Sequence, residues 1–232
     1  MERKDMVSKV QSLEDKIEAA KLYHRGGHLQ KAESIYREVL KEDPSNSEVT
    51  HLLGLLAMQV GKFEIAEHLF NTALELDKDK PEYYANLGVL YYLKGDFEKA
   101  KDLLEKALEL DKNYIEAHAN LGKIYAEENN LEQARIHLVR AVNMGDTDIS
   151  SLITLAEVNY RLKLYDRAED LCKQMLDLGH EEDQIYEILI ESICKQDRPL
   201  EAIPFAEVLV GRDKEKYTPI LEKVYKQAGM LD

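Results

Sequence analysis

The sequence predicts an all-α fold built from a repeated pair of helices, and three observations lead to this prediction. Rows of 34 residues that start at Leu13 align six times without an insertion or deletion and end at Lys216. Within each row the apolar residues recur at spacings of three and four, which is typical of one face of a helix. The twentieth residue is alanine in every row, which establishes the register: Ala32, Ala66, Ala100, Ala134, Ala168 and Ala202.

Each row divides into two helices near its fifteenth residue. In the first four rows this residue is Gly27, Gly61, Gly95 and Asn129, types that tolerate the left-handed conformation at the end of a helix. The eighth residue is Gly or Ala in the first five rows, so the two helices of a row can approach closely. We therefore expect six helix-turn-helix units, at 13–46, 47–80, 81–114, 115–148, 149–182 and 183–216.

The sixth row departs from this pattern. Ile190 takes the place of the small eighth residue, and Pro199 and Pro204 lie near or inside the second helix. Because a proline inside a helix removes a backbone hydrogen bond, we expect this unit to be splayed.

The two ends of the chain lie outside the rows. Residues 217–232 read as a capping helix, with Thr218 as its N-cap, Pro219 in its first turn and Gly229 at its end. The sequence leaves open whether residues 1–12 form a short helix or are disordered.

Composition narrows the classes of function. The chain has 45 acidic and 31 basic residues, a formal charge of −14, and no block of five or six basic residues, so nucleic-acid binding is not expected. No apolar stretch approaches the ~20 residues that cross a bilayer, so membrane insertion is not expected either. The charged N-terminus lacks the features of a secretory signal, and the two cysteines form no disulfide framework. We therefore expect a cytoplasmic protein.

The third row carries a family resemblance. Its residues Tyr84, Asn86-Leu87-Gly88, Tyr91, Gly95-Asp96-Phe97, Ala100, Leu104, Ala107 and 108–111 follow the tetratricopeptide repeat nearly throughout. The fourth row resembles it almost as well from residues 117–122 onward, and the six rows cover 204 of the 232 residues. The resemblance implies a right-handed α-solenoid in which stacked units bury each other's apolar faces, but it implies no particular partner.

The resemblance also implies a concave groove lined by the first helix of each row. The positions that face such a groove hold Leu55, Met58, Ala85, Asn86, Val89, Tyr92, Leu93, Ala119, Asn120 and Lys123. Asn86 and Asn120 lie one row apart, and their amides suit the N–H and C=O groups of an extended peptide. Glu48, Glu82 and Glu116 form the edge of the groove and favour basic residues in the ligand. The expected partner is a protein or peptide with apolar anchors and basic residues.

Other interpretations stay open. The apolar groove residues are also suited to packing between repeats, the asparagines are what the family prefers at this position, and a row of glutamates is also an ordinary solvated helix face. The convex face is the main competing surface. Two further roles compete with the adaptor: a self-assembling scaffold, which makes homo-oligomers, and a regulatory subunit of a larger enzyme or secretion complex.

No catalytic or cofactor-binding motif is present. The sequence lacks a phosphate loop, a His-Glu-x-x-His and a Gly-x-Ser-x-Gly. His24 and His28 are separated by glycines at a predicted turn, so they would not share a helix face. We therefore expect no enzyme, no metal and no cofactor. Family members that hold acidic chaperone tails need cations where this chain has Glu82 and Glu116, so such tails are not expected partners.

Overall fold

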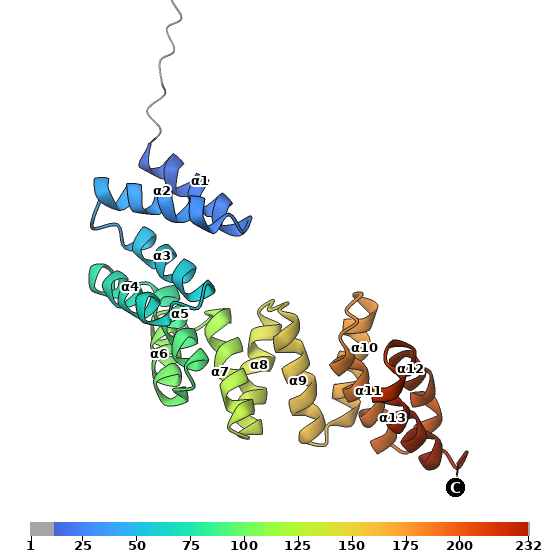
Figure 1. Cartoon of the computed structure of the whole chain (residues 1–232). Helices are drawn as coiled ribbons and strands as arrows, with labels where there is room; N and C mark the ends of the chain where they lie inside the picture. The colour runs from blue at the N-terminus through green and yellow to red at the C-terminus, as the bar shows by residue number, and fades with distance from the viewer. Residues whose placement is uncertain (1–11, 232) are drawn as a thin grey trace, which may run out of the picture. The chain divides into compact units, whose positions relative to one another are not determined.

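The computed structural model describes residues 12–231, which form thirteen α-helices and no strand (Figure 1). The helices are α1 (Leu13–Arg25), α2 (Leu29–Glu42), α3 (Ser47–Gln59), α4 (Phe63–Leu76), α5 (Pro81–Leu93), α6 (Phe97–Leu110), α7 (Ile115–Glu127), α8 (Leu131–Asn143), α9 (Ile149–Arg161), α10 (Tyr165–Asp177), α11 (Asp183–Lys195), α12 (Pro199–Arg212) and α13 (Lys214–Gln227). Through α12 they form six pairs, and the first helices of successive pairs begin 34 residues apart. The predicted all-α repeat fold is confirmed. Except for Ser12, the expectation for residues 1–12 lies outside the described residues.

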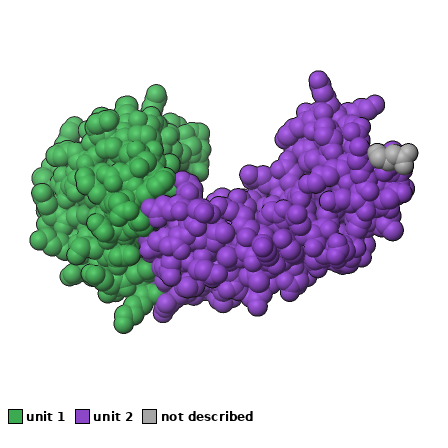
Figure 2. All heavy atoms as spheres, turned by 90° about the horizontal axis from the view of Figure 1, so that it is seen from below, with its two compact units in different colours: residues 1–112 green, residues 113–232 purple. Residues whose placement is uncertain are grey.

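The chain consists of two compact units, residues 1–112 and 113–232 (Figure 2). The described part of the first unit holds α1–α6, and that of the second holds α7–α13. In each unit the buried apolar residues run from one helix pair into the next. In the first, Tyr36 of α2 and Leu53 of α3 share a cluster; in the second, Leu138 of α8 shares one with Val158 of α9. Stacking of pairs therefore buries faces that a single pair leaves open.

Side chains and left-handed residues set the helix ends. Ser12 caps α1 in a capping box with Asp15, whose backbone N–H lies 3.1 Å from the Ser12 hydroxyl. The turn residues predicted from the sequence are left-handed, with φ of 75° at Gly27, 75° at Gly61, 80° at Gly95 and 61° at Asn129. Lys163 and Asp197 occupy the same position in the last two pairs and also have positive φ, 62° and 59°. The turn geometry is therefore kept even at Lys163, whose residue type does not favour it.

Within a pair, a missing side chain on the first helix accommodates a large one on the second. A Cβ added to Gly54 would lie 2.6 Å from the Phe70 ring, and one added to Gly122 would lie 2.5 Å from Cγ of Leu138. The sixth pair reverses the sizes, with Ile190 on α11 and Ala206 on α12 at the corresponding positions, both buried. The packed volume is thus retained.

The two helices of the sixth pair share a buried cluster, and the expected splaying stays a prediction. Ile190 and Ile193 of α11 are buried in one cluster with Ala202, Ala206 and Leu209 of α12. Pro199 is the first residue of α12, where no intrahelical N–H bond is lost. Pro204, the sixth residue, removes one intrahelical bond, and α12 nevertheless extends to Arg212.

The expected start of the capping helix is wrong. The helix begins at Lys214, and its N-cap is Asp213, whose side chain accepts from the backbone N–H of Lys216 at 3.0 Å. Thr218 and Pro219 therefore lie inside α13. The earlier start places Tyr217 in the helix, where it is buried and donates to Oδ2 of Asp183 at 2.7 Å. Gly229, with φ of 69°, follows the end of the helix as expected.

Candidate functional site

The predicted apolar positions of the first unit lie on α3 and α5. Leu55, Met58, Val89 and Tyr92 are half-buried, Leu93 is 52 % exposed, and Ala85 is buried. Leu55 and Met58 also pack against the cluster around Phe70 and Leu90. Packing between repeats therefore accounts for part of these side chains, while Leu93 remains available to a ligand.

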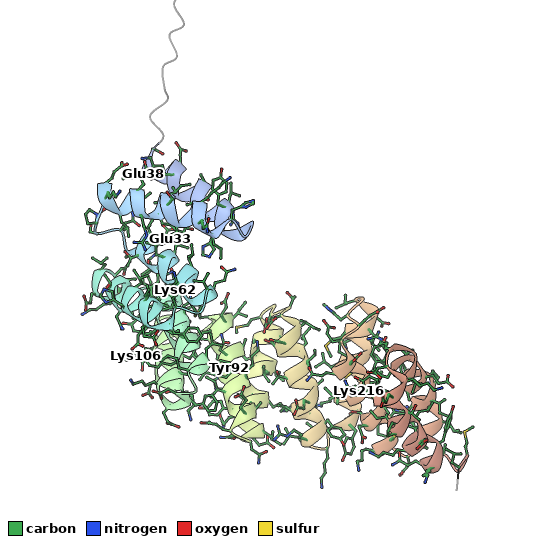
Figure 3. The ribbon with its side chains drawn as sticks, in the orientation of Figure 1. Glu33, Glu38, Lys62, Tyr92, Lys106 and Lys216 are labelled. Carbon is green, nitrogen blue, oxygen red and sulfur yellow. The ribbon has the colours of Figure 1, made fainter. Side chains whose placement is uncertain are left out.

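Tyr92, labelled in Figure 3, lies near the end of α5 beside the first residue of α6. Its ring stacks on that of Phe97 with centroids 5.8 Å apart. The stack limits the rotamers of Tyr92, so this aromatic surface would lose little side-chain entropy when a ligand packs on it.

Asn86 is bonded within the protein. Its Nδ2 lies 3.0 Å from Nε2 of His51, and the His51 ring stacks on that of Tyr83 at 4.4 Å. His51 is only 5 % exposed, and burial lowers its pKa to about 4. The ring is therefore neutral at physiological pH and accepts the amide proton through Nε2. Because one of the two N–H groups of this amide is already used, Asn86 has one donor fewer for a peptide carbonyl than its position implies.

A hollow of about 610 Å³ lies over the start of α3, and we call it the α3 hollow. It is lined by Asp43, Ser45, Asn46, Ser47, Glu48, His51, Leu52, Lys80, Glu82 and Tyr83. Two of the predicted edge residues, Glu48 and Glu82, are among them. Glu48 is paired with Lys21 of α1 at 2.5 Å. Three carboxylates against Lys80 make this hollow acidic.

A second hollow, of about 550 Å³, lies between α7 and the loop that precedes α9, and we call it the α7 hollow. Its lining consists of Ile115, Glu116, Ala119, Asn120, Lys123, Gly145, Asp146, Thr147, Asp148 and Ser151. The four predicted site residues of the fourth row, Glu116, Ala119, Asn120 and Lys123, thus meet in one place. Three carboxylates again oppose one lysine.

Two of these residues are held by partners inside the second unit. Asn120 donates through Nδ2 to the backbone carbonyl of Glu116 at 2.7 Å. Lys123 donates through Nζ to Oδ2 of Asp148 at 2.7 Å and to Oγ of Ser150 at 2.6 Å. Burial opposes the charge on Asp148, but the hydrogen bonds from Lys123 and Ser150 outweigh it and lower the pKa to about 2. Lys123 therefore fixes the loop and neutralises Asp148.

The loop residues of both hollows were missed by the sequence prediction. Asp146 and Asp148 follow Gly145 in the α7 hollow, and Asp43 precedes Ser45 in the α3 hollow. The only signal for them is a cluster of Asp, Ser, Thr and Gly between two helix pairs, which is also what any helix-joining loop contains.

Within residues 12–231 no three or more His, Cys, Asp or Glu side chains gather as metal ligands would. Nε2 of His24 lies 3.1 Å from Oε1 of Gln59, whereas His28 stands at the start of α2. Burial raises the pKa of the Cys172 thiol to about 12, so this cysteine is a poor nucleophile. Among the helices described, none combines the length and hydropathy needed to cross a membrane.

Sequence comparison places the chain in a family. Models of the tetratricopeptide repeat match residues 17–46, 45–113 and 91–153, which together span more than half of the chain. The chain belongs to the tetratricopeptide repeat family. No curated protein sequence matches it.

Solved structures with the same fold come from distant relatives. PilF of Pseudomonas aeruginosa superposes with a TM-score of 0.81 at 18 % identity, with 91 % of this chain and 97 % of that chain covered. PilW, a type IV pilus biogenesis factor, has a TM-score of 0.74 at 19 % identity with the same coverages. A tetratricopeptide repeat protein of Parabacteroides merdae has 0.65 at 19 %, covering 95 % of this chain and 93 % of that chain. At these identities the likeness establishes the fold alone. Family membership supports a role in protein–protein interaction.

Proposed function

We propose that this protein is a non-enzymatic adaptor that binds a short segment of a partner protein along the first helices of its repeats. The observation that carries this proposal is the recurrence of an acidic hollow over the same repeat positions, on α3 in one unit and on α7 in the other. Each hollow is open to a ligand and lined by the second, fifth and sixth residues of a first helix, which the family resemblance assigns to the ligand-facing side.

The ligand chemistry follows from these linings. An apolar residue of the ligand would pack on Leu93 and on the accessible parts of Leu55, Met58, Val89 and Tyr92. Glu48, Glu82 and Glu116 would favour lysine or arginine and disfavour an acidic tail. A cytoplasmic location stays a prediction from the sequence, whose two cysteines are too few for a disulfide framework.

Affinity capture from native lysate tests the adaptor function. Two variants of the full chain are compared with the wild type after circular dichroism has shown that all three are folded. The first replaces Leu55, Tyr92 and Leu93 by Glu. The matched control replaces three exposed apolar residues of the second helices and their ends, Ile65, Ile136 and Leu178, by Glu.

A partner retained by the control and lost by the first variant supports the proposal. Loss from the control variant alone would move the interaction to the second helices and contradict the proposal. Recovery of only the chain itself would favour a self-assembling scaffold, and mass measurement by light scattering over a range of concentrations would then give its stoichiometry.

A further inference from the structure

A hollow of about 280 Å³ lies between α2 and α4 in the first unit, and we call it the α2–α4 hollow. Seven of its eleven lining residues are apolar. Among them Leu53, Leu56 and Ala57 of α3 are buried, whereas Val60 is 44 % exposed and Ile65 is 50 % exposed. None of the predicted groove residues lines this hollow, so the proposed function leaves its apolar surface unexplained.

Two of the lining residues depart from the repeat pattern. Ala57 is the eleventh residue of its row, and the first, third and fourth rows have tyrosine there: Tyr23, Tyr91 and Tyr125. Ile65 is the nineteenth residue, and the other five rows have a charged or amide residue there: Lys31, Lys99, Gln133, Arg167 and Glu201. The second row therefore lacks an aromatic ring and gains an exposed apolar side chain, and both departures concern the same hollow.

The next helix pair shows what fills the equivalent space. The hydroxyl of Tyr91 donates to Oε1 of Glu67 at 2.6 Å, and its ring packs on a buried apolar cluster. Nζ of Lys99 lies 4.7 Å from the centroid of this ring. Ala57 precedes Tyr91 by 34 residues, and Glu33, which lines the α2–α4 hollow, precedes Glu67 by the same number. The hollow thus keeps the carboxylate of this arrangement and lacks the phenol.

Glu33 has an oxygen that a ligand can reach. Both contacts from Arg37 go to Oε1, at 2.9 Å from Nε and 2.8 Å from Nη2. Within the described residues Oε2 accepts no hydrogen bond, and the side chain of Glu33 is 35 % exposed. A hydroxyl that enters the hollow from outside would therefore find an accessible acceptor.

We propose that the α2–α4 hollow binds the side chain of a tyrosine from a partner protein. The ring lies over Ala57, between Val60 and Ile65, and the hydroxyl donates to Oε2 of Glu33. Tyrosine suits the hollow because its ring buries a large apolar area while its hydroxyl needs a polar partner. The inference goes beyond the proposed function, since it uses none of the residues assigned to the concave groove.

The charges at the rim favour an acidic residue beside this tyrosine. Glu33 and Lys62, labelled in Figure 3, come from α2 and from the start of α4. Lys62 is exposed, and no carboxylate of the described residues forms an ion pair with it. Together with Arg37 it gives the rim two cations against one carboxylate. The α3 and α7 hollows have the opposite balance, so the two surfaces select different ligands.

A second copy of this chain does not provide the tyrosine. Every tyrosine within residues 12–231 is buried or half-buried. Residues 1–11 and 232 contain no tyrosine. The occupant is therefore assigned to a different protein, one that presents an exposed tyrosine with an acidic neighbour.

The binding test uses the dipeptide Asp-Tyr, acetylated and amidated at its ends, titrated into isotope-labelled full-length protein and followed by amide NMR shifts. We expect saturable shifts at residues 53–69. The capped dipeptide Asp-Phe should bind about threefold more weakly, because it lacks the hydroxyl that donates to Glu33. Asn-Tyr, which is isosteric but uncharged, should also bind more weakly than Asp-Tyr.

Variants of the chain test the placement of the ring and of the hydroxyl. Ala57→Tyr fills the hollow from within, as Tyr91 fills the next one, and is expected to abolish the shifts. Glu33→Ala should make Asp-Tyr and Asp-Phe bind alike. The matched control is Glu75→Ala, which removes a carboxylate from an exposed position of α4 and should keep the preference for Asp-Tyr.

Three results would overturn the assignment: no saturable shifts at residues 53–69, equal affinity of Ala57→Tyr and the wild type, or equal affinity for Asp-Tyr and the capped dipeptide Asp-Leu. If circular dichroism shows that Ala57→Tyr is not folded, Ile65→Glu serves as the second variant. Because Ile65 is half exposed, this change should preserve the fold while placing a carboxylate against the ligand. Retention of wild-type affinity by Ile65→Glu would then count against the assignment.

The concave-groove variant separates this inference from the proposed function. The chain with Leu55, Tyr92 and Leu93 replaced by Glu should bind Asp-Tyr as the wild type does, and loss of binding would overturn the assignment to the α2–α4 hollow. In lysate capture, a protein lost from Ala57→Tyr and retained by the concave-groove variant would support the tyrosine site and contradict the adaptor proposal. A protein lost from the concave-groove variant and retained by Ala57→Tyr supports the adaptor function, and the dipeptide titration alone then decides the tyrosine site.

Discussion

Single buried groups in this protein carry consequences that the repeat pattern does not reveal, and His51 is the clearest case. Its ring is stacked on Tyr83 and bonded to Asn86, and burial lowers its pKa to about 4 from 6.5. The unfolded chain therefore binds a proton below about pH 6.5, whereas the folded chain stays neutral until about pH 4. Stability is expected to be full above pH 6.5 and to fall between these two values, by about 3 kcal/mol for this residue.

Urea unfolding at pH 7, 5.5 and 4.5 measures this loss. We expect His51→Gln to flatten the decline in the free energy of unfolding, and His68→Gln, a change at an exposed histidine of α4, to leave it as in the wild type. His137 has its pKa lowered to about 4 mainly by burial, so part of the decline remains in the first variant. An identical decline of stability with pH in His51→Gln and the wild type would contradict the assignment of this pH dependence to His51.

Lys163 is strained in its backbone. Its φ of 62° costs a residue with a Cβ about 1–2 kcal/mol, which glycine avoids apart from its larger entropy in the unfolded chain. Lys163→Gly is therefore expected to raise the free energy of unfolding by about 0.5–1 kcal/mol. The reverse change, Gly95→Lys at the same turn position, should lower it by about 1 kcal/mol. Equilibrium denaturation compares both with the wild type, and a neutral or destabilising Lys163→Gly would refute the strain.

At the scale of a helix pair, size complementarity controls packing. Gly122→Ala raises helix propensity by about 1 kcal/mol, yet its new Cβ would lie 2.5 Å from Leu138 Cγ. We expect the overpacking to dominate and to lower stability by about 1–3 kcal/mol. Gly211→Ala is the matched control, because nothing lies within 4 Å of a Cβ added in α12. Gly211→Ala should raise the free energy of unfolding by about 0.5–1 kcal/mol. Thermal unfolding of both variants measures these changes in stability. Stabilisation by Gly122→Ala would show that α7 and α8 move apart freely.

The sequence predicted what depends on local periodicity and missed what depends on packing. Recurring apolar spacing and glycine turns sufficed for the all-α repeat fold. Lys163 was not foreseen as left-handed, because packing of α9 against α10 imposes that geometry on a residue without the preference. Thr218 and Pro219 looked like a helix start, but the burial of Tyr217 and its bond to Asp183 favour a start at Lys214.

For the candidate site the same division holds. Repeat positions brought Glu116, Asn120 and Lys123 into consideration from the sequence alone. Asp146 was not predicted, because a loop residue has no periodic position and its place in the hollow depends on how the loop lies against α7. The bond between Asn86 and His51 was equally invisible, since it joins residues of two different repeats.

At the scale of the whole molecule, stability is expected to be distributed along the chain, because each helix pair packs chiefly on its neighbours. Tyr217 of α13 is 1 % exposed and bonds to Asp183 of α11, so the last helix covers the end of the second unit. Tyr217→Ala should lower the free energy of unfolding by about 3–5 kcal/mol. The loss of stability should be concentrated in the adjoining helix pairs. Hydrogen exchange is expected to lose protection in α11 and α12 while α3 and α4 of the first unit retain theirs.

The conservative change Tyr217→Phe separates packing from hydrogen bonding in this last helix. It keeps the buried ring and removes the hydrogen bonds of the hydroxyl, which donates to Asp183 and accepts from Lys216, so we expect a loss of about 1 kcal/mol and exchange rates in α11 and α12 close to the wild type. Uniform loss of protection in every helix of Tyr217→Ala would instead indicate that the two units unfold as one cooperative body. Nearest-neighbour stacking would then be insufficient to describe this chain.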